Sequence, residues 1–288
     1  MRTPWPIIGM CVSYLWFVKV IGPAIMRDRK AFELLTFIRI YNLGMVLWNV
    51  YGAMLTGVLL NWGIDTFGCQ PVNPEDRSEK ALNIIKYGHI FLMSRVAEFT
   101  DTICFVLRKK NRQISGFHVF HHFSVPIAVW FFLKFAPGGN SAIFPFLNTY
   151  IHMIMYSYYF LATFESLRPY LGWKKYLTQM QIIQFIIMIA HSSQPLFMPD
   201  CKFPRTFLYI NILFSLIFIY LFTKFYIDNY GKQTVRVAQN VGRRISQQLQ
   251  SGVRRLSQIN APMDASDKDY SHQRYANGKV TTKSGKQD

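Results

Sequence analysis

Residues 115–135 read SGFHVFHHFSVPIAVWFFLKF, an apolar stretch long enough to cross a membrane and interrupted near its start by three histidines. His118, His121 and His122 stand at positions i, i+3 and i+4, so a helix places them on one face. Ionisable side chains inside a bilayer are costly and usually functional. As purely structural residues, three histidines on one face would need too many buried partners. The stretch therefore predicts a membrane helix that carries a reaction centre.

The composition indicates a polytopic membrane protein. Of the 288 residues, 51% are hydrophobic and 16% are aromatic, and the apolar residues come in runs of about 20. The net charge is +17, but Lys and Arg stand in short loops beside these runs and in the tail, where they encode membrane orientation. Nucleic-acid binding is therefore not expected. The first run is too long for a cleavable signal peptide and has no small-residue cleavage site before Arg27.

We expect an all-α fold with seven transmembrane helices, together forming a domain over residues 1–230. The predicted helices are 5–25, 34–60, 87–107, 115–135, 141–164, 176–196 and 207–226. Strongly basic loops follow the first, third, fifth and seventh helices, and neutral or acidic segments follow the others. If the basic side faces the cytosol, the N-terminus is luminal or external and the C-terminus is cytosolic.

The four cysteines fall into two groups. The predicted topology puts Cys69 and Cys201 on the same non-cytosolic side, where disulfides persist, and leaves Cys11 and Cys104 within helices. The residues alone leave open whether Cys69 and Cys201 form a bridge or remain two free thiols.

Polar residues interrupt four of the predicted helices at similar depths. The rise of 1.5 Å per residue places them roughly 10 to 20 Å from the basic ends of their helices. Independent structural patches would not need a common depth, so we expect one pocket that opens to the cytosol through a collar of Lys and Arg. Besides the histidines of the fourth helix, its polar residues are Arg95, Glu98 and Asp101 on the third, Asn148, His152, Tyr156 and Tyr159 on the fifth, and Gln181 and Gln184 on the sixth.

A basic rim, imidazoles and an apolar interior together fit a fatty acyl group carried on coenzyme A. The H-x-x-H-H spacing also occurs in membrane di-iron desaturases and hydroxylases, whose two metals need several clusters of histidines. This chain has seven histidines, of which His272 lies in the tail, and no second cluster. Cys104 is an alternative nucleophile, but no His or Lys stands beside it locally. A seven-helix receptor or lipid transporter would share the loop charges but would leave the imidazoles unexplained.

Five segments occur in a fixed order: RVAEFTDT (95–102), LRKKN (107–111), HVFHH (118–122), NTYIHMIMYSYY (148–159) and TQMQIIQF (178–185). In this order they resemble the signatures of the ELO family, the very-long-chain fatty acid elongases. The likeness runs from about residue 22 to residue 224. The first motif of the family usually begins with Lys, where Arg95 stands here. Arginine keeps the charge but cannot act as a neutral amine.

The resemblance implies a 3-oxoacyl-CoA synthase that condenses an acyl-CoA with malonyl-CoA and needs no metal or other cofactor. It also implies that helices two to seven form a bundle around the acyl tunnel. We expect His121 to be the nucleophile, because a neutral imidazole can carry an acyl group between two half-reactions. His152 would take part in the condensation, and His118 and His122 would orient His121. The residues expected to support catalysis or bind substrate are Arg95, Glu98, Asp101, Asn148, Tyr156, Tyr159, Gln181 and Gln184. The residues expected to bind the coenzyme A phosphates are Arg108, Lys109, Lys174 and Lys175.

The resemblance further implies residence in the membrane of the endoplasmic reticulum, with a luminal N-terminus and a luminal bridge between Cys69 and Cys201. The reductases and the dehydratase of the elongation cycle are the implied partners, and a homodimer is compatible with the family.

The tail divides into two segments. Within residues 231–258, apolar residues recur every three or four positions against arginines, which predicts a basic amphipathic helix on an anionic membrane face. A calmodulin-type partner and disorder are the alternatives. Residues 259–288 are polar and are expected to be disordered. The apolar positions of the amphipathic pattern are Ala238, Val241, Ile245, Leu249, Val253 and Leu256.

Overall fold

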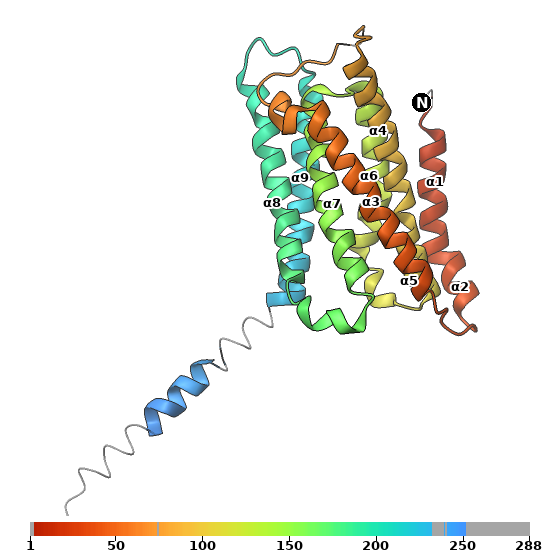
Figure 1. Cartoon of the computed structure of the whole chain (residues 1–288), viewed down its shortest axis with the longest axis vertical. Helices are drawn as coiled ribbons and strands as arrows, with labels where there is room; N and C mark the ends of the chain where they lie inside the picture. The colour runs from red at the N-terminus through yellow and green to blue at the C-terminus, as the bar shows by residue number, and fades with distance from the viewer. Residues whose placement is uncertain (1–2, 74, 232–238, 240, 252–288) are drawn as a thin grey trace, which may run out of the picture. The chain divides into compact units, whose positions relative to one another are not determined.

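The computed structural model describes residues 3–73, 75–231, 239 and 241–251. The chain divides into two units, Met1–Tyr230 and Gly231–Asp288. The described residues of the first unit form helices and no strand, which confirms the predicted all-α class (Figure 1). The helices are α1 (Trp5–Trp16), the π-helical turn η1 (Phe17–Ile21), α2 (Gly22–Met26), α3 (Leu35–Leu59), α4 (Glu79–Ala97), α5 (Phe99–Leu107), α6 (Gly116–Phe135), α7 (Ile143–Leu161), α8 (Lys174–Ser193) and α9 (Arg205–Tyr226).

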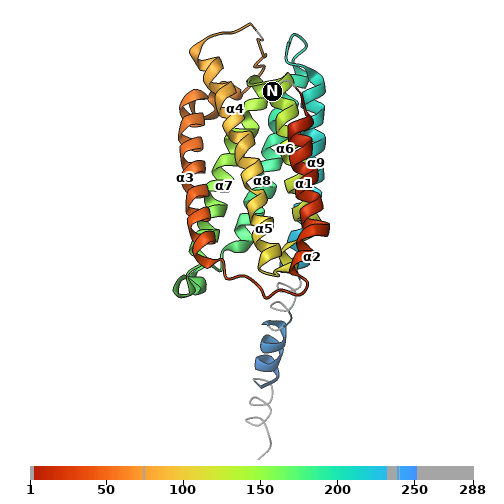
Figure 2. The ribbon, with the colours of Figure 1, turned by 90° about the vertical axis from the view of Figure 1, so that its right-hand side faces the viewer.

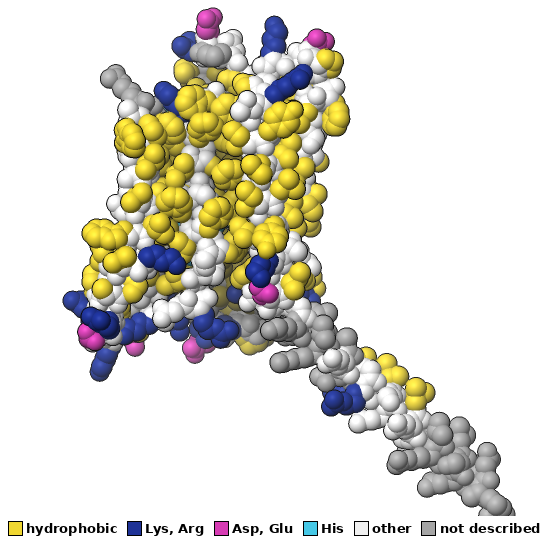
Figure 3. All heavy atoms as spheres, turned by 180° about the vertical axis from the view of Figure 1, so that it is seen from behind, with side chains coloured by type: hydrophobic (Ala, Val, Ile, Leu, Met, Phe, Trp, Pro, Cys, Tyr) yellow, Lys and Arg dark blue, Asp and Glu magenta, His cyan; other side chains and the backbone are white. Residues whose placement is uncertain are grey.

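Four helical stretches among the described residues are long and apolar enough to cross a membrane. They are Trp5–Met26, Leu35–Leu59, Gly116–Phe135 and Arg205–Gly231. Helices α4, α7 and α8 fall short of this criterion and carry buried polar residues, among them Arg95, His152 and Gln184. Figure 3 shows hydrophobic side chains over the middle of the helical body and charged ones toward its two ends. This distribution is that of a multi-pass membrane protein.

The predicted third helix was wrong in two respects. Helix α4 begins at Glu79 rather than at Tyr87, because the Ser78 hydroxyl caps it by accepting a hydrogen bond from the Ala81 N–H at 3.2 Å. The predicted third helix is also divided at Glu98 into α4 and α5. The first helix, predicted over 5–25, ends at Met26, and the π-helical turn η1 precedes Pro23 and takes up the change in hydrogen bonding.

The helices pack as neighbours in an order that differs from their order in the chain. Helix α3 packs against α7 and α4, α7 against α8, α8 against α9, and α4 against α6. Aromatic pairs connect α6 to α9, among them Phe117 with Phe222 and Phe120 with Phe218. Helix α1 packs against α6, and its continuation α2 packs against α5 (Figure 2).

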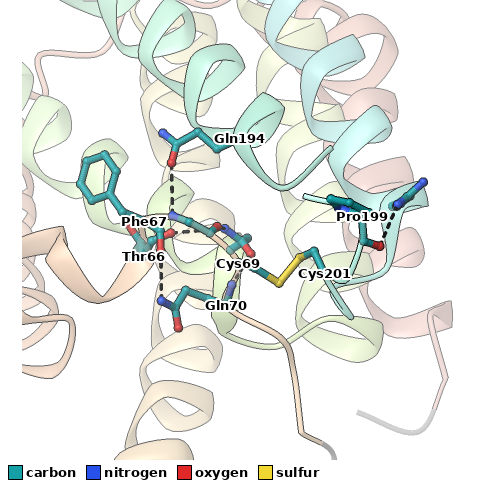
Figure 4. Close-up of a disulfide and its surroundings, with 10 residues drawn as sticks. Thr66, Phe67, Cys69, Gln70, Gln194, Pro199 and Cys201 are labelled. Carbon is teal, nitrogen blue, oxygen red and sulfur yellow. Dashed lines mark hydrogen bonds between the residues drawn. A yellow bond between two sulfur atoms is a disulfide. The ribbon is translucent and has the colours of Figure 1, made fainter. Parts of the chain in front are cut away.

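One end of the helical body carries the disulfide, and we call it the disulfide end. Cys69, in the segment after α3, is bonded to Cys201, in the segment before α9 (Figure 4). The side-chain oxygen of Gln194 accepts a hydrogen bond from the Gly68 N–H at 3.2 Å and holds this segment to the end of α8. The opposite end carries the basic segments 27–30, 108–112 and 174–175, and we call it the basic end.

In the second unit, residues 241–251 are helical. Val241, Ile245 and Leu249 are exposed and stand four residues apart, on one face of this helix. The other apolar positions of the predicted amphipathic segment, Ala238, Val253 and Leu256, lie outside the described residues, as does the predicted disordered segment 259–288.

Candidate active site

Three buried polar residues form the innermost part of the site, where α4 meets α7. The guanidinium of Arg95, only 1% exposed, donates through Nη1 to Oδ1 of Asn148 at 2.9 Å. Its Nη2 lies 2.9 Å from Oε1 of Glu98, one turn further along. Oε1 has no partner with hydrogen-bond geometry among the described residues, so this contact is an ion pair rather than a hydrogen bond. The pair neutralises two charges that would otherwise be very costly inside a membrane protein.

His152 lies beside this ion pair in a defined orientation. Its Nδ1 is 2.9 Å from the carbonyl oxygen of Asn148, and a carbonyl can only accept, so Nδ1 carries a proton that it donates. In the neutral ring, Nε2 therefore carries the lone pair. Nε2 lies 3.5 Å from Oε1 of Glu98, which makes Nε2 the position where His152 can bind a further proton.

A second hydrogen-bonded group lies nearer the basic end. The Tyr156 hydroxyl donates to Oδ2 of Asp101 at 2.6 Å and so connects α7 to α5. The hydroxyl of Tyr41 on α3 lies 3.5 Å from that of Tyr156 and donates to the carbonyl of Ala97 at 3.3 Å. Three helices are thereby fixed around one carboxylate.

The histidines of α6 stand on one side of their helix, as their spacing predicted. Ser115 caps α6 by accepting from the His118 N–H at 3.1 Å, which sets where the helix begins. The ring centroids of His118 and His122 are 4.3 Å apart, and those of His121 and His122 are 5.3 Å apart. Pro126 has no N–H, so the carbonyl of His122 lacks its usual partner within the helix.

Among the described residues, His118 is the histidine of the motif with a ring hydrogen bond, whereas the ring nitrogens of His121 and of His122 have no hydrogen-bond partner. Aromatic rings surround His121: its centroid lies 6.4 Å from that of Phe117 and 5.3 Å from that of Phe218. Its side chain is partly exposed, whereas His122 is buried. His121 therefore keeps a free lone pair in a position that a bound molecule can reach.

An apolar cavity of about 100 Å³ lies between the histidines and the disulfide end. Phe218 and Phe185, whose rings stack with centroids 5.2 Å apart, are part of its wall. None of the described histidines lines the cavity; because Phe218 also contacts His121, its phenyl ring lies between the imidazole and the cavity. Other wall residues come from α3, α4, α6 and the segment before α7, among them Leu59, Gly88, Ala128, Leu133 and Ala142.

The structure thus brings most of the predicted site residues together, but some lie apart. Among the described residues, the side chain of Gln181 has one hydrogen-bond partner, the sulfur of Met155 on α7 at 3.7 Å, and the amide of Gln184 faces Met188 on its own helix. Tyr159 is 36% exposed, and its ring packs against that of Tyr156. The four cations predicted for coenzyme A stand at the basic end, where Arg108 is half-buried and Lys109, Lys174 and Lys175 are exposed.

The described residues contain no group of three His, Cys, Asp or Glu side chains arranged to hold a metal ion. The prediction that no metal or other cofactor is needed stays a prediction.

The sequence interpretation missed several residues of the site. Tyr14 of α1, Tyr41 of α3 and Phe218 of α9 all contact residues that the motifs identified. Each is one aromatic residue in an apolar helix, and no polar periodicity marks it. Only the packing of the helices reveals that these side chains face the site.

The sequence as a whole matches a known family. The sequence profile of the GNS1/SUR4 family (ELO) matches residues 1–238. The chain belongs to the ELO family. Among ELO proteins, it is 39% identical to a very long chain fatty acid elongase of Aedes aegypti over 234 residues, which cover 80% of this chain but only 64% of that relative. It is 40% identical to very long chain fatty acid elongase 7 of Drosophila melanogaster, covering 81% and 71% of the two chains. With human very long chain fatty acid elongase 1, the identity is 36% and the coverage 84% and 88%.

Proposed function

We propose that this ELO protein is a condensing enzyme of fatty acid elongation. It would join a long-chain acyl-CoA to malonyl-CoA and release a 3-oxoacyl-CoA, carbon dioxide and coenzyme A. The names of the relatives support fatty acid elongation. The condensation step is proposed from the residues of the site.

The proposed arrangement is seven membrane crossings in the endoplasmic reticulum, with α3 to α9 around an acyl tunnel. The basic loops support a cytosolic basic end and a luminal disulfide end, because positive charge favours the cytosolic side. The N-terminus would then be luminal and the C-terminus cytosolic. The neighbour contacts of α3, α4, α6, α7, α8 and α9 support a bundle around the cavity.

One observation carries the proposal: the imidazole of His121, without a hydrogen-bond partner among the described residues, packs on a phenyl ring that forms part of the wall of an apolar cavity. The ring of His121 touches Phe218, and Phe218 lines the cavity. A fatty acyl chain in this cavity would leave its thioester carbonyl beside His121, while the coenzyme A part would extend toward the basic end. Among the described residues, none donates a hydrogen bond to the lone pair of His121, so the lone pair is available to a substrate.

In the first half-reaction, a ring nitrogen of His121 attacks the thioester carbonyl. The carbon–sulfur bond breaks, coenzyme A leaves as the thiolate, and the acyl group remains on the imidazole. The other ring nitrogen of His121 loses its proton, which goes to the thiolate. Nε2 of His152 is available to hold this proton on the way, because Nδ1 is already committed to Asn148.

In the second half-reaction, malonyl-CoA loses carbon dioxide, and the electron pair of the broken bond remains on the adjacent carbon. This carbon attacks the acyl group on His121 and forms the new carbon–carbon bond, while the imidazole leaves and regains a proton. Decarboxylation supplies the carbanion equivalent, so no metal is needed. The ion pair of Arg95 and Glu98 keeps His152 in place during both steps.

The cations of the basic end are the proposed contacts for the coenzyme A phosphates. Guanidinium and ammonium groups bind phosphate well, and the four side chains stand at the end of the helical body where the coenzyme A part of the substrate would lie. The reductases and dehydratase that process 3-oxoacyl-CoA are proposed partners, and a homodimer remains compatible with the proposal. The four cations are Arg108, Lys109, Lys174 and Lys175.

The test compares purified wild-type protein with His121→Ala in the presence of a long-chain acyl-CoA and malonyl-CoA. The matched control is His89→Gln, since His89 is a histidine of α4 whose Nδ1 bonds only to Ile85 of its own helix, at 2.9 Å. We expect wild type and the control to form 3-oxoacyl-CoA, detected by mass spectrometry, and His121→Ala to form none. Wild-type turnover in folded His121→Ala would remove His121 from the mechanism.

A further inference from the structure

Helix α1 carries none of the family motifs, yet one of its side chains is connected to the histidine motif. Tyr14 is 4% exposed, and its ring stacks on Phe99 with centroids 4.3 Å apart. Its hydroxyl lies 3.1 Å from Oγ1 of Thr102, which is itself fully buried. Oγ1 of Thr102 lies 2.8 Å from Nε2 of His118. A chain of two hydrogen bonds therefore runs from α1 through α5 to α6.

Which group donates in each of these two hydrogen bonds follows from counting the hydroxyl protons. Within the described part of the protein, the Tyr14 hydroxyl has no partner except Thr102, and the Thr102 hydroxyl has none except Tyr14 and His118. Both hydroxyl protons are paired only if Tyr14 donates to Thr102 and Thr102 donates to His118. Any other arrangement leaves a buried hydroxyl proton without an acceptor, which is unfavourable. Nε2 of His118 is then an acceptor, and the neutral ring carries its proton on Nδ1.

Tyr14 also decides how Thr102 is oriented. A threonine within a helix usually turns its hydroxyl back to a carbonyl of its own helix, three or four residues earlier. Thr102 makes no such bond in the structure. With the Tyr14 proton directed at its oxygen, the Thr102 hydroxyl points to His118 instead. Without Tyr14, the hydroxyl is free to turn back and to accept from an Nε2–H of His118.

We propose that Tyr14 is a positioning residue that acts through Thr102 and holds His118 in its Nδ1–H form. The ring of His118 packs against that of His122 with centroids 4.3 Å apart, and His122 packs against His121 with centroids 5.3 Å apart, so the side of the His118 ring that carries the proton changes the polarity presented to the two neighbouring rings. The catalytic part of this inference rests on the proposed function, in which His118 and His122 orient His121. The hydrogen-bond chain itself does not depend on that function.

The test is Tyr14→Phe, which removes the hydroxyl and keeps the ring on Phe99. The matched control is Tyr51→Phe, because Tyr51 is an exposed tyrosine of α3 that makes no hydrogen bond to the histidine motif within the described residues. The full-length protein is labelled with ¹⁵N-histidine, and the His118 signals are assigned by their loss in His118→Gln. The nitrogen shifts report the tautomer, and steady-state kinetics report kcat and KM for acyl-CoA.

We expect the Nδ1–H form of His118 in wild type and in Tyr51→Phe, and a mixture of both tautomers in Tyr14→Phe and in Thr102→Val. Thr102→Ser, which keeps the hydroxyl, should give the wild-type spectrum. In Tyr14→Phe, kcat should fall roughly five- to tenfold, the loss of one hydrogen bond, while KM stays unchanged. An Nε2–H form in wild type, an unchanged spectrum in Tyr14→Phe, or a changed spectrum with unchanged kcat would each overturn the positioning role. If wild type forms no 3-oxoacyl-CoA at all, the proposed function fails, and the hydrogen-bond chain is decided by the spectra alone.

Discussion

The buried pair of Arg95 and Glu98 offers a quantitative test of how the site is held together. Glu98→Gln would leave a guanidinium that is 1% exposed without its counter-charge. Removing one partner of a buried ion pair costs about 3 to 5 kcal/mol, or between two and four powers of ten in the unfolding constant. Arg95→Met should lower the free energy of unfolding by less than Glu98→Gln does. The remaining carboxyl group can bind a proton and become neutral, whereas a guanidinium in a protein keeps its proton and its charge.

The assay is equilibrium unfolding in mixed micelles by titration with SDS, for both single variants and the double variant. The double variant should be more stable than the two single losses predict, which gives a positive coupling energy. The chain offers a matched control in Glu165 and Arg168, also an i,i+3 pair, 3.7 Å apart but exposed. Its coupling should be about 0 to 1 kcal/mol. A Glu98→Gln variant within about 1 kcal/mol of wild type, or equal coupling in the two pairs, would refute the reasoning.

Three further predictions concern the cavity and the disulfide end. Ala128→Leu adds an isopropyl group to the wall of the 100 Å³ cavity, so the preferred acyl-CoA should become shorter in a chain-length series analysed by mass spectrometry; an unchanged preference would contradict the acyl assignment. Cys201→Ser opens a bridge between residues 132 apart in sequence, and should lower the free energy of unfolding by roughly 2 to 5 kcal/mol in the SDS titration, whereas no loss would count against a structural role. The pKa of Asp65 is lowered from its ordinary value of 3.8, first by its hydrogen bond with Lys80, so the stabilisation is present above that value and is lost as the pH falls through the folded-state pKa. Lys80→Met should raise the pKa of Asp65 in a ¹³C NMR titration, and an unchanged pKa would exclude the Lys80 contact as its cause.

The fold class could be predicted from sequence because long apolar runs leave a membrane protein few alternatives to helices. The boundaries of α6 were predicted to within one residue, since Ser115 and the turn after Phe135 mark them locally. The start of α4 was missed because Glu79, Lys80, Asn83 and Lys86 interrupt the apolar residues of its first turns. Hydropathy identifies the part of a helix within the membrane but does not predict a capped extension of the helix outside it.

The candidate site could be predicted in part for a geometric reason. Spacing along one helix determines which side chains share a face, so the grouping of Arg95 with Glu98 followed from sequence. Contacts between helices depend on the rotation of each helix about its own axis, which packing sets and one sequence does not reveal. Tyr14 and Phe218 were missed for that reason, and Gln184 was placed in the group although its amide faces Met188.

The most direct test of the central claim is the intact mass of the purified protein after incubation with a long-chain acyl-CoA alone. We predict a mass increase equal to the acyl group, mapped to His121 by peptide analysis and absent in His121→Gln. His89→Gln should still acquire the acyl group, and malonyl-CoA should discharge it with formation of 3-oxoacyl-CoA. Product formation upon addition of malonyl-CoA, without an adduct on His121 beforehand, would contradict the acyl-imidazole mechanism.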